Sequence, residues 1–372
     1  MLEKHASYLV DPLTNESMSV TCFEKKWEHI RSGELIASTN TYPIIKGVPR
    51  LLTWELKHDM LKTHEEFYGL YRDKLSAELR VEREKIVGTM AWPSSLNHDD
   101  FLTHQKKTAE SFWFERNTSY EENTYEMDNF IHFLGWLLPS ADFENKIVLD
   151  VGCGSWRFTK MTARLGAKLC IGVDLSEAVE FAFELTHEFD NILIVQGDIY
   201  HLPFEQVADI AYSIGVLHHL PDPKQWFLSI PNRVLKDWWQ MLIRVYSKKN
   251  NARALYFYEP MRTITRHIPK RLLLAFCHIP AFGVHLINLL SIWFAKIGFK
   301  RIAEKMPFRY YTNFPYSMKH NDAFDVLATP KSNYYYLEDI QEWFTEAKLK
   351  HLQGTYLKEA GLTFIGTKGV DE

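Results

Sequence analysis

The 372-residue chain is longer than one typical domain, so we expect a core fold with added segments. Its composition is globular, at 46% hydrophobic and 24% charged residues, and its formal net charge of −4 argues against broad binding to nucleic acid, so no such partner is expected. Four scattered cysteines without a C-x-x-C pair argue against a disulfide framework and a cysteine-only zinc site, so no metal is expected. The opening residues lack a long apolar core, so we expect no secretory signal and a cytoplasmic location.

Residues 1–55 are expected to form a small β module. Tyr8–Leu13 and Thr41–Leu52 have the apolar content of strands, punctuated by Pro and Gly. The second stretch resembles the closing strands of small zinc-ribbon modules. In such a module one cysteine pair would stand near Asp11 and Thr14 and another just before the Tyr-Pro-Ile run, where this chain has none. The resemblance therefore implies a ribbon fold that has lost its metal, and a plain β-extension is the alternative.

Residues 56–140 are predicted to be helical from the periodicity of their apolar residues. They are rich in charge, and residues 78–87 have the composition of a solvated helix. Around residues 110–116 the character changes to aromatic. Packing of these aromatics between a helix and a sheet, with Arg116 in a surface ion pair, is the direct interpretation.

The core, residues 141–248, begins with a strand, a glycine turn and a helix. Ile147–Val151 is a short apolar run typical of a strand buried on both faces. Gly152 and Gly154 follow, and apolar residues then recur at helical spacing up to Gly166. This order is the first unit of a nucleotide-binding α/β sheet, in which the glycines let a ligand lie against bare backbone.

The turn lacks the features that bind pyrophosphate. Arg157 stands where a dinucleotide fingerprint needs its third glycine, and no Gly-Lys-Ser/Thr sequence follows. Later strands are predicted at Leu169–Asp174, Ile192–Asp198, Ala208–Gly215 and 237–246. The acid that ends the first of these lies 20 residues beyond the second glycine of the turn, which places it to accept both hydroxyls of a ribose.

Residues 249–330 are expected to be a helical insertion that interrupts the sheet. Residues 272–295 contain no charged side chain if histidine is neutral, and their number approaches the ~20 residues of a membrane span. Proline, glycine, histidine and asparagine interrupt this stretch, which would be costly in lipid. We therefore expect a helical cap over the active site; a peripheral membrane contact or a hydrophobic wall for an apolar substrate are the alternatives.

Residues 331–372 are expected to complete the core. Leu337–Ala347 is an amphipathic helix, and Leu352–Leu357 and Leu362–Thr367 are two strands. The four-residue link between the strands is too short for anything but antiparallel pairing.

Asp150 and the two-glycine turn, followed at strand–helix spacing by Asp174, Asp198 and the run Val216–Asp222, resemble the class I S-adenosylmethionine (SAM)-dependent methyltransferases. The resemblance implies an α/β fold with a seven-stranded, mostly parallel Rossmann-like sheet whose last strand is antiparallel. It also implies SAM as the cofactor, with a carboxylate on the ribose and an acid that accepts from the adenine amine. The residues implied in cofactor binding are Asp150, Gly152, Gly154, Trp156, Asp174, Leu175, Asp198, Ile199 and Ser213.

Trp156 is a departure from the family pattern, which prefers a third glycine at this position. A large indole there would pack beneath an intact SAM site, or bend SAM away from ordinary methyl transfer, or abolish cofactor binding. Some members of this fold consume SAM without methylating anything, including cyclases that make azetidine-2-carboxylate. A cation–π contact with the sulfonium is compatible with the first two outcomes.

The candidates for a general base follow or end the fourth core strand, at the edge where the methyl group of SAM would lie. They are His218, His219 and Tyr212; histidine changes protonation near neutral pH, as proton removal requires. A structural role for both histidines is the alternative, since many members of the family have no dedicated base. Candidate substrate residues implied by the resemblance are Trp113, Arg116, Tyr310 and Asp322.

We therefore predict a SAM-dependent methyltransferase with a small-molecule or lipid-like acceptor enclosed by the cap. A non-methylating SAM-consuming enzyme such as a cyclase, or a catalytically silent scaffold, are the alternatives. The oligomeric state and the acceptor itself are left open. The expected parts are the module 1–55, the helical segment 56–140, the core 141–248, the cap 249–330 and the completing segment 331–372.

Overall fold

The computed structural model describes residues 1–88, 125–249, 251–252, 254–265, 267–329, 332–357 and 361–369. The candidates Trp113 and Arg116 lie outside these residues. The described chain folds as two compact units. The first holds the described residues of 1–88, 125–249 and 333–369, and the second holds those of 251–332.

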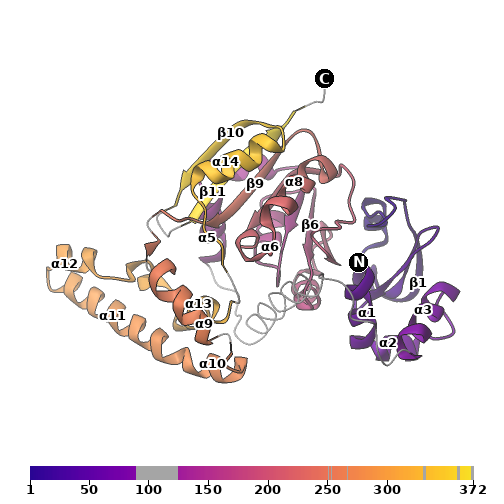
Figure 1. The fold of residues 1–372 in the computed structure, drawn as a ribbon, viewed down its shortest axis with the longest axis horizontal. Coiled ribbons are helices and arrows are strands. Elements are labelled where there is room, and N and C mark those ends of the chain that lie inside the picture. Colours follow the sequence, from indigo (N-terminus) through magenta and orange to yellow (C-terminus); the bar gives the residue numbers. More distant parts are fainter. Residues whose placement is uncertain are drawn as a thin grey trace. The chain divides into compact units, whose positions relative to one another are not determined.

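The first unit is built on one large mixed sheet (Figure 1). The described residues give it eleven strands in the order β1-β2-β3-β4-β7-β6-β5-β8-β9-β11-β10. These strands are β1 (Ser19–Lys26), β2 (His29–Ile36), β3 (Thr41–Ile45), β4 (Val48–Leu51), β5 (Ile147–Val151), β6 (Leu169–Asp174), β7 (Ile192–Gly197), β8 (Ala208–Ile214), β9 (Leu235–Tyr246), β10 (Leu349–Tyr356) and β11 (Gly361–Lys368).

The predicted α/β fold is confirmed. The segments predicted as the core hold seven strands, β5 to β11, and the N-terminal module extends the same sheet by four strands, which was not predicted. Strands β1 to β4 form an antiparallel meander. Strand β4 then pairs in parallel with β7, with Arg50 opposite Gln196 and Leu51 opposite Gly197. Strands β5 to β9 are parallel to their neighbours, and β11 is antiparallel to both β9 and β10.

Helices cover both faces of the sheet, because each buried strand sends alternate side chains to opposite sides. On β5, Leu149 joins the hydrophobic core that includes Trp226 of α8 and Phe344 of α14, whereas Asp150 accepts a hydrogen bond from Thr159 of α6. The helices of this unit are α1 (Trp54–Thr63), α2 (Glu65–Leu70), α3 (Ala77–Gly88), α5 (Tyr125–Leu134), α6 (Arg157–Arg164), α7 (Ala178–Thr186), α8 (Pro223–Val234) and α14 (Leu337–Glu346), with 3-10 turns η1 (Glu3–Tyr8), η2 (Ser140–Phe143) and η3 (Leu217–His219).

The strand predicted at Tyr8–Leu13 is wrong. The chain there leaves η1 and turns, and a carboxylate closes that turn, because Asp11 Oδ1 accepts the backbone N–H of Leu13 at 2.7 Å. The other oxygen accepts from Asn40 Nδ2 at 2.8 Å, and the Tyr42 hydroxyl donates to Oδ1 at 3.2 Å. Asp11, which is fully buried, thus joins the two turns of the N-terminal module.

The start of β9 is irregular, and a tryptophan lies at the irregularity. Trp238 has a positive φ of 69°, and the pairing of β8 with β9 shifts register between Ala208 and Ile210. The indole of Trp238 is exposed, so the irregularity places its bulk outside the core. The predicted strand at 237–246 is confirmed from this point to its end.

The second unit is helical in its described residues. Its elements are η4 (Ala254–Tyr258), α9 (Glu259–Thr265), α10 (Lys270–Phe276), α11 (His278–Lys296), α12 (Lys300–Lys305), η5 (Arg309–Asn313) and α13 (Tyr316–Ala328). A small core forms where Leu273 and Cys277 pack against Phe324 and Leu327 of α13. The candidates Tyr310, in η5, and Asp322, in α13, both belong to this unit.

Candidate functional site

The glycine turn after β5 is tied to the neighbouring strand. The backbone N–H groups of Gly152 and Cys153 both donate to the carbonyl of Val173, at 2.8 and 3.0 Å. Gly152 has φ of +83°, and a Cβ atom at this position would lie 2.4 Å from Val216 Cγ2. Glycine is therefore required here both for the backbone conformation and for the close approach of the loop after β8.

Asp174, at the end of β6, faces this turn. Its Oδ2 accepts the backbone N–H of Gly154 at 2.8 Å. Its Oδ1 accepts the backbone N–H and the hydroxyl of Ser176, at 2.8 and 2.7 Å. A carboxylate offers about four acceptor positions, so Asp174 retains capacity for a further donor such as a sugar hydroxyl. The predicted link between this acid and the glycine turn is thus present in the fold.

Asp198, which follows β7, lies one strand farther along the same edge of the sheet. Its Oδ1 accepts the N–H of Tyr200 at 3.0 Å, and its Oδ2 lies 3.0 Å from His201 Nδ1. The next residue, Ile199, is buried, and its carbonyl accepts from Trp226 Nε1 at 2.7 Å. These bonds fix the loop in which an adenine amine would meet the acid.

Asp150 and Ser213 connect the elements that surround the glycine turn. The Asp150 carboxylate is buried and accepts from Thr159 Oγ1 at 2.7 Å, which ties the first turn of α6 to β5. Ser213 Oγ donates to the Val151 carbonyl at 2.9 Å and so joins β8 to the end of β5. Both side chains bond to protein groups, which indicates that they position the turn.

The histidine candidates lie at the carboxyl end of β8. His218 is fully buried, and its ring centroid lies 3.8 Å from that of Tyr246 and 4.1 Å from that of His219. Tyr246 ends β9 and stacks on Tyr334 with 5.8 Å between centroids. The backbone N–H of Asn333 donates to the His218 carbonyl at 2.7 Å, which holds this segment in place. The structure thus brings together an imidazole pair and an aromatic pair at one sheet edge.

Tyr212 has a different environment. Its hydroxyl lies 2.9 Å from Thr162 Oγ1, and its ring contacts Phe130 and Phe143, which is the packing of a core side chain. Burial, together with the charge of Asp150, raises its pKa well above the usual value. A phenol in this setting stays protonated, so we do not assign Tyr212 the proton-removing role considered above.

Residues 149–237 match a family model described as a methyltransferase domain. The chain therefore contains a SAM-dependent methyltransferase domain over these residues. Over 125 residues it is 35% identical to protein arginine N-methyltransferase 1 of Saccharomyces cerevisiae, covering 31% of this chain and 36% of that protein. Over 166 residues it is 24% identical to the tRNA U34 carboxymethyltransferase of Pseudoalteromonas atlantica, covering 43% of this chain and 46% of that protein.

The chain spans less than half the length of these two curated relatives. Among solved structures it is similar to 1,6-didemethyltoxoflavin-N1-methyltransferase of Burkholderia thailandensis, with a TM-score of 0.43 and 14% identity over 76% of this chain and 94% of that one. The two curated relatives differ in the acceptor named for them, so the similarity identifies the SAM-dependent methyltransferase domain and does not identify the substrate.

The described residues of the methyltransferase domain fit SAM. Gly152 and Gly154 both have positive φ, so the turn carries no side chain of its own at these two positions, and the Val216 side chain lies against Gly152. Asp174 holds this turn and keeps acceptor positions that a ribose would use, and Asp198 would accept from an adenine amine. The chemistry of these donors and acceptors suits an uncharged adenosine and not a diphosphate.

Trp156 adopts a backbone that normally belongs to glycine, with φ of 122°. Its indole is buried, and Lys160 Nζ lies 4.9 Å from the ring centroid. The sequence alone suggested a cation–π contact with a sulfonium; the cation that the structure places over this ring is the Lys160 ammonium. The methyltransferase domain thus keeps the loop shape of a glycine while burying a large side chain.

A cluster that the sequence did not reveal connects the N-terminal module to the loop after β6. Arg50 of β4 is fully buried and donates to Glu177 at 2.8 Å, to Glu180 at 2.6 Å and to Gln196 at 2.8 Å. Gln196 Nε2 in turn donates to the carbonyl of Leu175 at 3.0 Å, next to Asp174. The module that extends the sheet therefore braces the loop that would hold the ribose.

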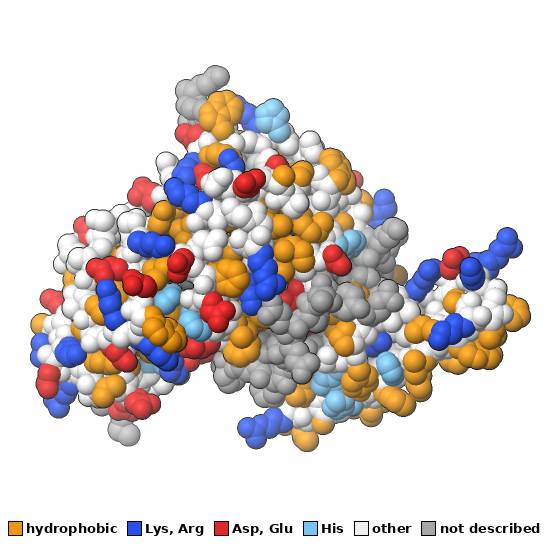
Figure 2. All heavy atoms as spheres, turned by 180° about the vertical axis from the view of Figure 1, so that it is seen from behind, with side chains coloured by type: hydrophobic (Ala, Val, Ile, Leu, Met, Phe, Trp, Pro, Cys, Tyr) orange, Lys and Arg blue, Asp and Glu red, His pale blue; other side chains and the backbone are white. Residues whose placement is uncertain are grey.

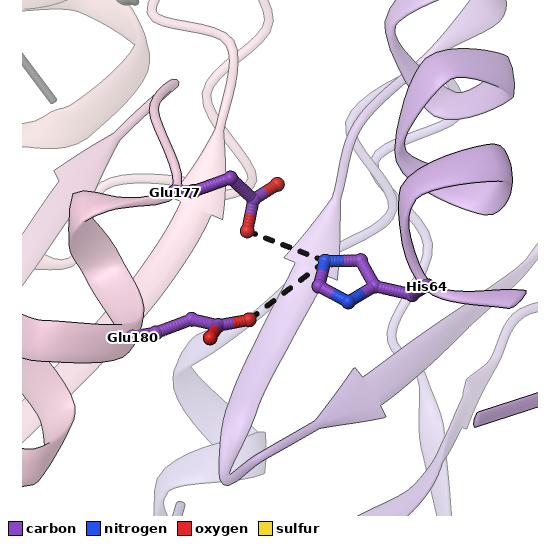
Figure 3. Close-up of side chains that lie close together, drawn as sticks. All are labelled: His64, Glu177 and Glu180. Atoms are coloured by element: carbon purple, nitrogen blue, oxygen red, sulfur yellow. Dashed lines mark hydrogen bonds and ion pairs between the residues drawn. The ribbon is translucent and has the colours of Figure 1, made fainter. Parts of the chain in front are cut away.

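His64 completes the cluster, with Nε2 3.2 Å from Glu177 and 3.8 Å from Glu180 (Figure 3). The three ligand atoms lie within 4.8 Å of one another, close enough to hold a metal ion. Arg50, however, donates to both carboxylates and already supplies their positive charge. This arrangement favours an ion-pair cluster over a cation site.

The cluster predicts a loss of stability in acid. Burial alone would raise the pKa of Glu177, but the hydrogen bond from His64 and the charge of Arg50 outweigh burial and lower it to about 2. A carboxylate whose folded pKa lies below its unfolded value of about 4.3 contributes stability above that value and loses it as the pH falls. We therefore expect the free energy of unfolding, measured with urea, to decrease between pH values of about 4.3 and 2.

The Arg50→Met variant tests the origin of this dependence. Removing the buried cation leaves Glu177 to His64 and Gln196, and Glu180 to Lys46. The loss of the buried partner costs about 3–5 kcal/mol at neutral pH, and the acid-dependent decrease becomes smaller. Arg31→Met is the matched control, because Arg31 pairs with Glu184 at a more exposed site and its loss should cost less than about 1 kcal/mol. Equal effects of the two substitutions would contradict the role given to Arg50.

Proposed function

We propose that the whole chain is a SAM-dependent methyltransferase whose acceptor is a small molecule of apolar or lipid-like character. The observation that carries this proposal is the fully buried imidazole of His218, packed against the half-buried ring of Tyr246 at the carboxyl ends of β8 and β9. These strands belong to the same parallel set as β6, which ends in Asp174. An acceptor lying against buried aromatic rings is better matched by an apolar molecule than by the charged surface of a polymer.

When bound, SAM supplies a methyl carbon made electrophilic by its sulfonium. The chain's own residues bind the adenosine, orient the acceptor and exclude water. A buried imidazole nitrogen of His218 accepts a proton from the acceptor if the acceptor carries one. The ring of Tyr246, tilted by 35° to the imidazole, packs against it and restricts its orientation.

A second candidate is a SAM-consuming enzyme that transfers no methyl group to a separate acceptor. The glycine-like backbone of Trp156, which keeps a buried indole at the turn, is the observation that supports it. Incubation of the purified protein with SAM, with and without a panel of apolar small molecules, distinguishes the two. We expect S-adenosylhomocysteine that depends on an added acceptor. Methylthioadenosine formed from SAM alone would instead support the second candidate.

We also propose that the N-terminal module is a zinc ribbon that has lost its metal. Asp11 supports this interpretation, because one carboxylate accepts from Leu13, Thr14, Asn40 and Tyr42 and so joins the two turns that cysteines would otherwise link through zinc. In this module hydrogen bonds to a buried carboxylate take over the task of a metal.

A further inference from the structure

Helix α11 exposes its large apolar side chains and buries small or polar ones. Its large apolar side chains point to solvent, with Trp293 53% exposed and Ile279 68% exposed. The buried residues of this helix are small or polar: Ala281, Asn288 and Ser291. A helix on the surface of a water-soluble domain shows the opposite arrangement.

The exposed side chains form one continuous row, which we call the apolar stripe. Their positions recur three or four residues apart, which places them along one side of α10 and α11. The apolar stripe consists of Leu272, Phe276, Ile279, Phe282, Leu286, Leu289, Leu290, Trp293 and Ile297, all at least 44% exposed. Figure 2 shows hydrophobic side chains gathered along the edge of this helical unit.

Two hydrogen bonds keep the apolar stripe facing outward. Asn288 Nδ2 donates to the carbonyl of Phe308 at 2.9 Å, and Ser291 Oγ donates to the carbonyl of Ala303 at 3.2 Å. Both bonds run from the inner side of α11 to the segment after it. If α11 rolled to bury the apolar stripe, both polar groups would lose these partners, at a cost comparable to a broken hydrogen bond each.

The unit that carries the apolar stripe is strongly basic. Residues 251–332 contain twelve Lys and Arg against four Asp and Glu, a net charge of +8. The complete chain has a net charge of −4, so the remaining residues sum to −12. Exposed cations flank both ends of the apolar stripe: Arg271 at one end, and Lys296, Lys300, Arg301 and Lys305 at the other.

We propose that this face docks on an anionic lipid bilayer, with α11 lying in the plane of the membrane interface. An apolar row bordered by cations is the arrangement that inserts into one leaflet while contacting acidic headgroups. Residues Lys270–Lys296 have the length and hydropathy of a membrane span. The inner side of α11, however, packs against α12, α13 and η5, so lipid reaches only its outer side.

The proposal goes beyond methyl transfer and does not depend on it. It selects a lipid surface over RNA because the apolar stripe consists of aliphatic and aromatic side chains, which gain little from contact with a phosphate backbone. It selects lipid over a second copy of the chain because two copies would bring together two basic faces. Binding to RNA and self-association remain outcomes of the test.

Vesicle sedimentation of the full chain tests the proposal. We expect binding to vesicles of phosphatidylcholine with an anionic lipid, and binding at least about tenfold weaker to phosphatidylcholine alone or at high salt. The double variant Leu286→Glu/Trp293→Glu should lose at least about tenfold in binding. The variant Lys300→Glu/Arg301→Glu should weaken binding only to the anionic vesicles.

The matched control is Leu70→Glu/Trp27→Glu, which replaces one leucine and one tryptophan of the first unit that are 73% and 72% exposed. It should bind vesicles as the unaltered protein does. Each variant replaces exposed side chains, and an unchanged thermal midpoint establishes that it is folded. No binding to either kind of vesicle, equal binding by the stripe and control variants, or a stripe that instead mediates dimers or RNA binding would overturn the proposal.

Discussion

Replacing Asp174 with alanine is expected to weaken SAM binding by at least about tenfold, because the ribose would lose charge-assisted hydrogen bonds worth about 1.5–3 kcal/mol each. The carboxylate also holds the glycine turn through the N–H of Gly154. Its removal therefore loosens the loop that faces the methionine portion as well. Isothermal titration calorimetry with SAM and with S-adenosylhomocysteine measures the loss directly.

Asp190→Ala is the control for this measurement. Asp190 is an exposed acid that precedes β7, at the end of the strand opposite to Asp198. The substitution changes the net charge of the protein by the same amount as Asp174→Ala. We expect its affinity for SAM to equal that of the unaltered protein. If Asp174→Ala bound SAM with unchanged affinity, the assignment of the ribose to the end of β6 would be wrong.

The sequence predicted the parts of the fold in which neighbouring residues determine the structure. Strands β5 to β8 were readable because each is a short apolar run buried on both faces. Helix α8 was readable because Trp226, Ile230 and Val234 recur at helical spacing, and all three are buried. The acid at Asp174 was readable because ligands of parallel sheets bind at the carboxyl ends of the strands.

Contacts between distant segments were not predictable in this way. Arg50 lies 127 residues before Glu177 and 146 before Gln196, and no local pattern marks an arginine as buried. Strand β1 was missed because most of it is exposed, and β2 was missed because its buried residues include the polar side chains His29, Ser32 and Glu34. They continue the sheet only because β4 pairs with β7, which is a tertiary contact.

The positive φ values of non-glycine residues are another feature that the sequence does not predict. Trp156 stands where the family pattern has glycine, and both Trp156 and Trp238 have the positive φ that favours glycine. The sequence revealed the bulky residue at position 156 but left its consequence open. The side chain is buried within the fold for Trp156 and lies in solvent for Trp238.

The largest effect on turnover is expected from His218→Gln, which removes the group that we propose accepts the proton. General-base catalysis contributes a factor of about 10²–10⁴, so the rate at saturating SAM should decrease by that factor when the acceptor must lose a proton. The affinity for SAM should remain unchanged, because the imidazole packs against the ring of Tyr246 at the end of β9, whereas Asp174 at the end of β6 bonds to the glycine turn.

The pH dependence of the rate distinguishes a base from a structural histidine. With His218 present, the rate should fall once the pH is low enough to protonate the imidazole, since a protonated imidazole cannot accept a proton. With His218→Gln, this dependence should disappear along with most of the rate. His187→Gln is the control, because the Nδ1 atom of His187 lies 2.8 Å from the carbonyl of Glu184 and its ring packs beside Phe183, on α7. If the His218→Gln variant kept its rate and pH profile but unfolded at a lower temperature, His218 would have a structural role only. The acceptor would then have to react without a base from the protein.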